Sequence, residues 1–177
     1  MKKYLNLLLI LLFVFALTGC GCSRREEEPQ KEEEIVLADD ELLFDGILYK
    51  FNKTEKHYGI SYKVSENMRL WDSGNAYNYF SVKHDDEVDA FIIRVFYYKN
   101  KNVAYAIKDT TDNKYEKKES VELDGRKYTK VQLKNPGGAT TYLFYYKHKK
   151  DVYAYCFTSL NEVERLESIF LKSVVYK

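Results

Sequence analysis

The hydrophobic pattern divides the chain into three parts. Residues 4–17 are almost wholly apolar (YLNLLLILLFVFAL), and residues 23–34 (SRREEEPQKEEE) contain no apolar side chain. From about residue 36 onward, apolar and polar positions alternate along many short segments. Because successive side chains of a strand point to opposite faces, a period of two is typical of β-strands. The pattern predicts a leader, a polar linker and one β-rich domain over residues 41–177.

The clearest turn is the pair Asp124-Gly125. This pair is typical of a type I′ turn, in which both central residues have positive φ, so residues 120–134 are predicted as a hairpin. The other predicted strands are residues 59–64, 76–83, 89–98, 139–147, 151–158 and 173–177, with polar turns at 84–88, 135–138 and 148–150.

Two segments follow the helical period instead. Residues 102–110 carry apolar side chains at helical spacing, and Asn102 is a candidate N-cap. Residues 161–172 show the same spacing, and Asn161 with Glu164 resembles a capping box. The expected apolar faces are Val103, Ala106, Ile107 and Thr110 in the first helix and Val163, Leu166, Ile169 and Phe170 in the second.

The segment 151–158 is apolar on both of its faces, and so is most of 89–98. In the first of these segments, one face consists of Val152, Ala154 and Cys156, and the other consists of Tyr153, Tyr155 and Phe157. A strand that is apolar on both faces needs to be covered on both faces. The sequence therefore predicts an α+β fold, with a mainly antiparallel β-sheet flanked by helices or by the N-terminal arm.

The N-terminus has the features of a lipoprotein signal peptide over residues 1–19. A positive start precedes the apolar run, which is shorter than the roughly 20 residues of a membrane-spanning helix. Leu17, Thr18, Gly19 and Cys20 resemble the bacterial lipobox. The resemblance implies that the Cys20 thiol receives a diacylglyceryl group and becomes the first residue after cleavage. An ordinary cleaved signal with a chance cysteine is the alternative.

Residues 20–40 are then expected to form the lipidated cysteine and a flexible charged tether with a span of roughly 25 Å. Two acyl chains give stable anchoring, so the expected location is the extracytoplasmic face of the cell membrane. Cleavage removes two of the 28 basic residues while all 27 acidic residues stay, which leaves a net charge of −1. A global basic field is absent, and we expect no nucleic-acid partner.

Three segments of the domain resemble the PsbP-like family. They are YGISYKVSENM (58–68), which is similar to its opening strand, VELDGRKYTKVQLK (121–134), similar to its central hairpin, and ESIFLKSVVYK (167–177), similar to its closing helix and strand. Ser65 and Met68 stand where the family usually has Pro and Trp. The resemblance implies a PsbP-like α/β/α sandwich with accessory or binding roles and no shared catalytic residues.

Candidate catalytic and metal-binding residues are scarce. His57, His84 and His148 are the only histidines, and their spacing suits no metal site. Cys156 lies on a predicted strand and is expected to be a buried hydrophobic residue rather than a nucleophile. We therefore expect no enzymatic activity, no metal and no cofactor, and an envelope hydrolase is the least favoured alternative.

Two charged segments fall on predicted turns. HDDEVD (84–89) is dense in carboxylates, but the alternating Ca²⁺ loop pattern is absent, so a polar hairpin tip is the better interpretation. KHKKD (147–151) is basic and has the same interpretation, with contact to anionic lipid headgroups or wall polymers as the alternative.

Tyrosine is unusually abundant, at 17 residues, many of them on predicted strands. Tyrosine is amphipathic, so exposed tyrosines can stack on sugars or anchor a protein partner. The alternative is that they fill a sheet covered on both faces. The candidate binding surface consists of Tyr97, Tyr142, Tyr146, Tyr153 and Tyr155.

The leading hypothesis is a membrane-anchored, non-enzymatic accessory module that binds another envelope protein. The tether, the aromatic strands and the missing catalytic pattern support it. The alternative is a receptor for a small ligand or glycan that uses the tyrosine-rich strand surface.

Overall fold

The computed structural model describes residues 36–44, 46–82, 88–135, 139–159 and 163–177. They belong to one compact unit, Val36–Lys177. The expected signal peptide, the lipobox and nearly all of the tether lie outside the described residues, and so do most of the turns predicted at 84–88 and 135–138. Within the described part of the chain, no helix is both long and apolar enough to cross a bilayer.

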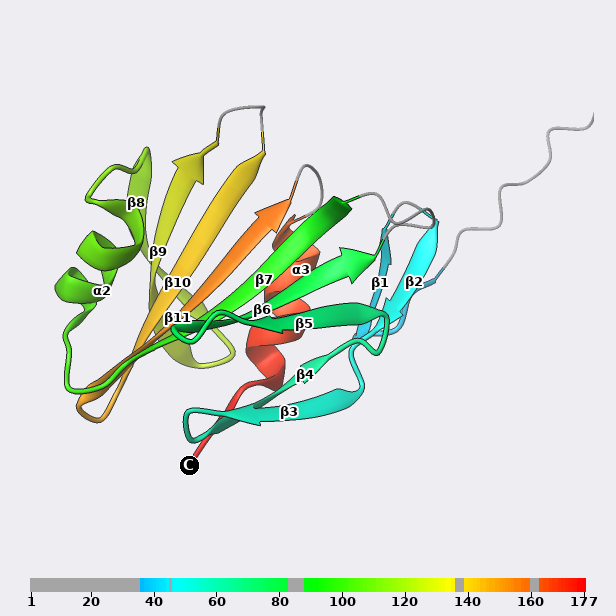
Figure 1. The fold of residues 1–177 in the computed structure, drawn as a ribbon, viewed down its shortest axis with the longest axis horizontal. Coiled ribbons are helices and arrows are strands. Elements are labelled where there is room, and N and C mark those ends of the chain that lie inside the picture. The colour runs from blue at the N-terminus through cyan, green and yellow to red at the C-terminus, as the bar shows by residue number, and fades with distance from the viewer. Residues whose placement is uncertain (1–35, 45, 83–87, 136–138, 160–162) are drawn as a thin grey trace, which may run out of the picture. The chain divides into compact units, whose positions relative to one another are not determined.

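A seven-stranded antiparallel sheet is the centre of this unit (Figure 1). Long strands occupy its middle and short ones its edges. In spatial order the strands are β5 (Met68–Asp72), β6 (Ala76–Val82), β7 (Val88–Tyr98), β11 (Asp151–Ser159), β10 (Thr140–His148), β9 (Arg126–Lys134) and β8 (Lys117–Leu123).

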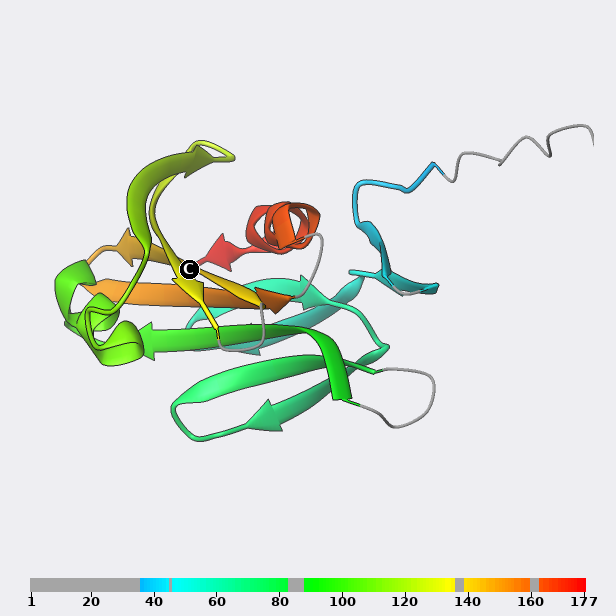
Figure 2. The ribbon, with the colours of Figure 1, turned by 90° about the horizontal axis from the view of Figure 1, so that it is seen from above.

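Other elements cover the two faces of this sheet. Helix α3 (Val163–Ser173) lies along one face, as Figure 2 shows, and helix α2 (Val103–Thr111) packs on β10 and β11. The remaining strands are β3 (Lys53–His57), β4 (Ile60–Val64) and β12 (Val175–Tyr176), which form a three-stranded sheet beside α3, and the hairpin β1 (Glu41–Phe44) with β2 (Ile47–Lys50). The result is a sheet-dominated α+β fold.

Strand β11 separates two hydrophobic cores, as its sequence predicts. Three aromatic side chains of β11 belong to the larger core, on the α3 side. Three smaller side chains of β11 belong to the smaller core, on the α2 side. The buried residues of this strand are Tyr153, Tyr155 and Phe157 in the first core and Val152, Ala154 and Cys156 in the second. The prediction of a strand covered on both faces is confirmed.

Local predictions are also confirmed at two places. Asp124 and Gly125 have φ of 52° and 69°, as a type I′ turn needs. The Asn102 side chain accepts a hydrogen bond from the Tyr105 backbone N–H at 2.8 Å and caps α2. The tight turn predicted at 148–150 is shorter, because β10 continues to His148.

The sequence pattern missed four strands, β1, β2, β3 and β5. Strand β3 (KTEKH) contains no apolar side chain, and β5 (MRLWD) is mostly exposed, so neither shows an inside–outside alternation. Both are outer strands of their sheets, where one side of the strand has no neighbour to pack against.

Candidate binding surfaces

The five candidate tyrosines all lie on the α3 side of the sheet, but they do not form an open surface. Tyr155 is 0% exposed and Tyr153 is 5% exposed, while the other three, Tyr97, Tyr142 and Tyr146, are half-buried. Tyr153 and Tyr155 therefore present no exposed ring to a ligand, which agrees for these two residues with the alternative that tyrosines fill a covered sheet. The physical reason is that α3 and the three-stranded sheet cover this face.

The hydroxyl groups of these two buried tyrosines have partners within the domain. The Tyr155 hydroxyl lies 2.7 Å from the Tyr176 hydroxyl, and the Tyr153 hydroxyl donates to the Tyr58 carbonyl at 3.0 Å. Burial raises the pKa of both phenols. A buried phenol whose hydroxyl is already bonded supports packing rather than ligand binding.

Three of the five tyrosines, Tyr97, Tyr146 and Tyr153, belong to a continuous array of rings. The ring centroids of Tyr97 and Tyr153 are 5.3 Å apart, and those of Tyr153 and Tyr176 are also 5.3 Å apart. Tyr146 continues the array at 4.7 Å from Tyr176. Tyr142 lies apart from it, with the Lys130 ammonium 4.1 Å from its ring centroid.

The Tyr97 ring also stacks on Tyr58 at 5.1 Å, and the Tyr97 hydroxyl donates a hydrogen bond to Asp151 Oδ2 at 3.0 Å. Burial and then this carboxylate raise the pKa of Tyr97 to about 12. The phenol is therefore neutral at physiological pH and donates a charge-assisted hydrogen bond.

Two of the histidines are also packed between aromatic rings. The His57 ring stacks on Tyr77 at a centroid distance of 3.5 Å, and burial lowers its pKa. His148 stacks on Tyr176 at 5.0 Å. Among the described residues, no group of three His, Cys, Asp or Glu side chains could hold a metal ion. His84 lies outside the described residues.

Cys156 is a free, buried cysteine in the smaller core. Burial raises the pKa of its thiol, which disfavours the reactive thiolate. Its environment is that of a small hydrophobic residue, as the sequence predicts.

A buried ion pair lies between β9 and α3. Lys130 Nζ is 3.2 Å from Glu167 Oε2, and the side chains of Lys130 and Glu167 are 16% and 6% exposed. Burial outweighs the attraction of Lys130 and raises the pKa of Glu167 to about 7. Sequence reasoning missed this pair, because Lys130 and Glu167 are 37 residues apart.

Strand β5, at one edge of the central sheet, carries two large apolar side chains that are exposed. Trp71 is 62% exposed and Leu70 is 45% exposed. The Trp71 ring contacts Phe80 of β6 at a centroid distance of 6.2 Å, and the Asn78 amide donates to the Trp71 carbonyl at 3.0 Å. Within the described residues, β5 pairs with β6 alone, so its other side is an open sheet edge.

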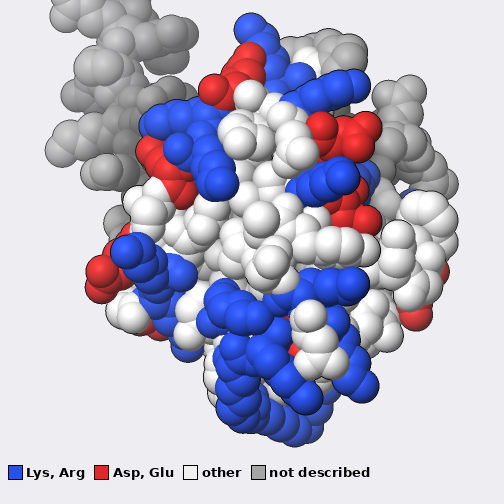
Figure 3. Space-filling view, turned by 90° about the vertical axis from the view of Figure 1, so that its left-hand side faces the viewer, with Lys and Arg blue, Asp and Glu red and all other residues white. Residues whose placement is uncertain are grey.

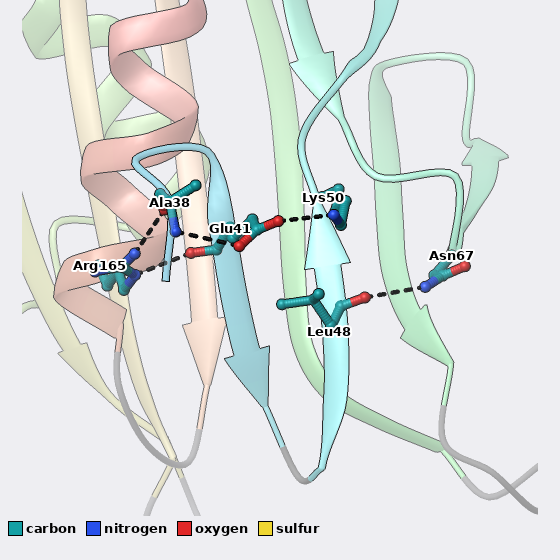
Figure 4. A network of polar contacts seen from close by, with 6 residues as sticks. All are labelled: Ala38, Glu41, Leu48, Lys50, Asn67 and Arg165. Atoms are coloured by element: carbon teal, nitrogen blue, oxygen red, sulfur yellow. Dashed lines mark hydrogen bonds and ion pairs between the residues drawn. The ribbon is translucent and has the colours of Figure 1, made fainter. Parts of the chain in front are cut away.

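The N-terminal arm (residues 36–40) and the β1–β2 hairpin are held against α3 by polar contacts (Figure 4). Arg165 donates from Nε to the Glu41 carbonyl at 2.9 Å and from Nη2 to the Ala38 carbonyl at 2.8 Å. Glu41 pairs with Lys50 at 2.9 Å, which joins β1 to β2. These contacts, the arm clamp, fix the place where the preceding chain joins the domain.

Comparisons with known proteins give a structural match but no family. No family model matches the chain, and no curated protein matches it. Solved structures do match, and one of them is the crystal structure of a protein from Bacteroides thetaiotaomicron VPI-5482, with 12% sequence identity and a TM-score of 0.48. The match covers 67% of this chain and 45% of that chain, so it spans less than half of that protein's length.

Proposed function

We propose that this protein is a lipid-anchored, extracytoplasmic accessory module that binds an envelope protein and has no enzymatic activity. The lipobox at Leu17–Cys20 supports the anchor, with diacylglyceryl and a further acyl chain on Cys20. The central sheet, with helices on both faces, supports the finer assignment to the PsbP-like α/β/α sandwich, whose members have accessory or binding roles.

The observation that carries the proposal is the exposed edge of β5. Trp71 and Leu70 are adjacent in the strand, so they project to opposite faces of the sheet and flank the open edge. Arg69 and Asp72 flank this pair in β5, but the two large apolar side chains between them stay exposed, and an exposed apolar edge can pair with other strands. A partner with an extended segment can add a strand here, with backbone hydrogen bonds and two apolar anchors.

The alternative, a glycan receptor that uses the tyrosine-rich strands, has less support. It needs exposed tyrosine rings, and two of its five residues, Tyr153 and Tyr155, are buried. A glycan would have to stack on Trp71 instead.

Site-specific photo-crosslinking from native membranes tests the proposal. The acylated full-length protein carries a photoreactive amino acid in place of Leu70, and a matched variant carries it in place of Tyr105, which is equally exposed on α2. We expect one envelope protein to crosslink from position 70 and not from position 105. The crosslink should be lost in Trp71→Ala and in the secreted Cys20→Ala form.

Equal crosslinking from both positions, or none from position 70 in a folded protein, would contradict the proposal. Trp71→Ala removes an exposed side chain, so its stability should stay within about 0.5 kcal/mol of the wild type. Binding of a wall glycan that is lost in Trp71→Ala, without a protein crosslink, would favour the receptor instead.

A further inference from the structure

Two loops at one end of the central sheet carry a cluster of exposed lysines. Figure 3 shows Lys and Arg gathered on this side of the domain, most densely in the lower part of the view. The cluster, here called the basic end, consists of Lys99 and Lys101 between β7 and α2 and of Lys147, Lys149 and Lys150 at the β10–β11 turn.

Lys147 holds the two loops of the basic end together. Its ammonium donates to the Lys101 carbonyl at 2.9 Å and to the Lys150 carbonyl at 2.7 Å. The exposed side chains of Lys99 and Lys150 therefore lie on two loops that these hydrogen bonds join to each other. Repulsion between like charges makes such a cluster costly unless an anion compensates it.

Lys149 Nζ donates to the Lys177 backbone oxygen at 3.3 Å, but no acidic side chain of these two loops is free to compensate the cluster. Asp151 is their only acidic residue, and both of its oxygens are already bonded. Tyr97 donates to Oδ2 at 3.0 Å, and the Asn100 backbone N–H donates to Oδ1 at 2.8 Å. The first turn of α2, which follows Lys101, also contains no acidic residue.

The positive charge is a local feature and not a consequence of overall composition. The chain has 28 basic and 27 acidic residues, yet five lysines and one aspartate occupy these two loops. Charge of one sign on one end of a nearly neutral protein indicates an anionic partner.

The basic end and the arm clamp lie at opposite ends of the central sheet. Strand β11 begins at Asp151 beside the basic end and ends at Ser159, a length of roughly 28 Å. Helix α3 then returns toward the basic end, because Tyr176, just after it, contacts His148. Arg165 of the arm clamp is in the first turn of α3 and therefore lies at the far end.

We propose that the basic end binds a linear polyanion of the envelope that carries phosphate groups. Lysine ammonium groups are point charges with three donors each, which suit phosphate oxygens without a fixed geometry. Lysines spread over two exposed loops match successive charges of a polymer better than one compact anion. With the chain anchored at Cys20, a step that rests on the proposed function, the basic end is exposed to such polymers in the envelope.

Lysine footprinting of the full-length acylated protein tests the proposal. The protein is placed in neutral phosphatidylcholine vesicles, and amine acylation is measured by mass spectrometry with and without long-chain polyphosphate. We expect polyphosphate to protect Lys99, Lys101 and Lys150. Lys118 and Lys134, which are exposed near the opposite end of the sheet, should stay reactive.

Charge-reversal variants supply the matched control. Lys99→Glu with Lys150→Glu should weaken polyphosphate binding at least tenfold and lower its dependence on salt by about one to two in log–log slope. Lys118→Glu with Lys134→Glu changes net charge equally and should keep most of the affinity. These four side chains have no role in the β5 edge, so failure here leaves the proposed docking of an envelope protein untouched.

Three results would overturn the proposal. One is equal loss of affinity in both double variants, which would indicate a diffuse charge effect. Another is protection of Lys99 and Lys150 by phosphatidylglycerol in the vesicles but not by polyphosphate, which would indicate a membrane-facing surface. The third is no protection by polyphosphate at low salt.

Discussion

Glu167 shows how one buried residue links the stability of the domain to pH. Its side chain lies on the buried face of α3, and one of its oxygens, Oε1, has no hydrogen-bond partner in the described structure. Removing a carboxylate from water favours its protonated form, and Lys130 offsets this only in part. The folded protein therefore holds a proton on Glu167 at pH values where the unfolded chain has lost it.

This proton gives the first prediction. The pKa of Glu167 is raised from 4.5 to about 7 in the folded state, so binding of this proton stabilises the fold. This stabilisation is complete below about pH 4.5 and is lost as the pH rises through about 7. At about 1.4 kcal/mol for each pH unit, the loss reaches at most roughly 3 kcal/mol. Urea unfolding between pH 4.5 and 8 should show this slope in the wild type and not in Glu167→Gln.

Glu122→Gln, at an exposed position of β8, is the control and should keep the slope. A wild-type profile that matches Glu167→Gln over this range would contradict the assignment.

At the scale of elements, the β1–β2 hairpin depends on contacts far away in the chain. Two strands of four residues are too short to be stable alone in water. Arg165 of α3 supplies two hydrogen bonds to the N-terminal side of the hairpin, and Asn67 donates from Nδ2 to the Leu48 carbonyl at 3.2 Å on the other side (Figure 4). The hairpin is thus held between α3 and the segment before β5.

We expect Arg165→Ala to loosen this hairpin locally. The loss of two hydrogen bonds to backbone carbonyls by an exposed side chain should lower the free energy of unfolding by about 1 kcal/mol. Hydrogen exchange should become faster in β1 and β2 while β11 stays protected. Lys172→Ala, at another exposed position of the same helix, should leave both unchanged. Uniform acceleration across the sheet would contradict a local role for the clamp.

At the scale of the whole molecule, the two cores share the central strands. Strand β11 contributes alternate residues to each core, so neither core can lose its packing without disturbing the other. Leu166 of α3 and Ile107 of α2 are both buried, on opposite faces of the sheet. The domain should therefore unfold as one cooperative unit.

Leu166→Ala and Ile107→Ala test this expectation from the two sides. Each should lower stability by about 2 to 5 kcal/mol, as large-to-small changes in cores do, and each should shift the same single transition. Far-UV and near-UV circular dichroism should report coincident urea curves in both variants. Val175→Ala, at an exposed position, should cost no more than about 0.5 kcal/mol. Separate transitions for the two faces would show that the cores fold independently.

The sequence allowed accurate prediction wherever the signal was local. Ile60 and Tyr62 alternate with polar neighbours in β4, and both are buried as expected. The Asp124-Gly125 turn and the Asn102 cap depend on residues within a few positions of each other, so pattern alone located them. Strands β3 and β5 escaped detection because they gain their order by pairing with a neighbour rather than by burying a face.

The candidate site depended on contacts that no periodicity reveals. Tyr153 and Tyr155 are residue types that suit an aromatic binding surface. Elements α3 and β12, which follow in the chain, cover both of them. Trp71 is the only tryptophan, and a tryptophan in a short polar segment was the available signal for an exposed site. Its exposure is visible only once β5 is known to lie at the sheet edge.

The sequence by itself determined that this domain is built from strands covered on both faces, because side-chain alternation is a property of neighbouring residues. It also contains the segment Leu17–Cys20, whose resemblance to a lipobox predicts the anchor. Only the tertiary structure decided which aromatic residues are buried, which strand ends the sheet, and that Lys101 and Lys147 join two loops into one basic end. These properties arise from pairing between distant segments, and the free energy of that pairing depends on the whole fold rather than on local pattern.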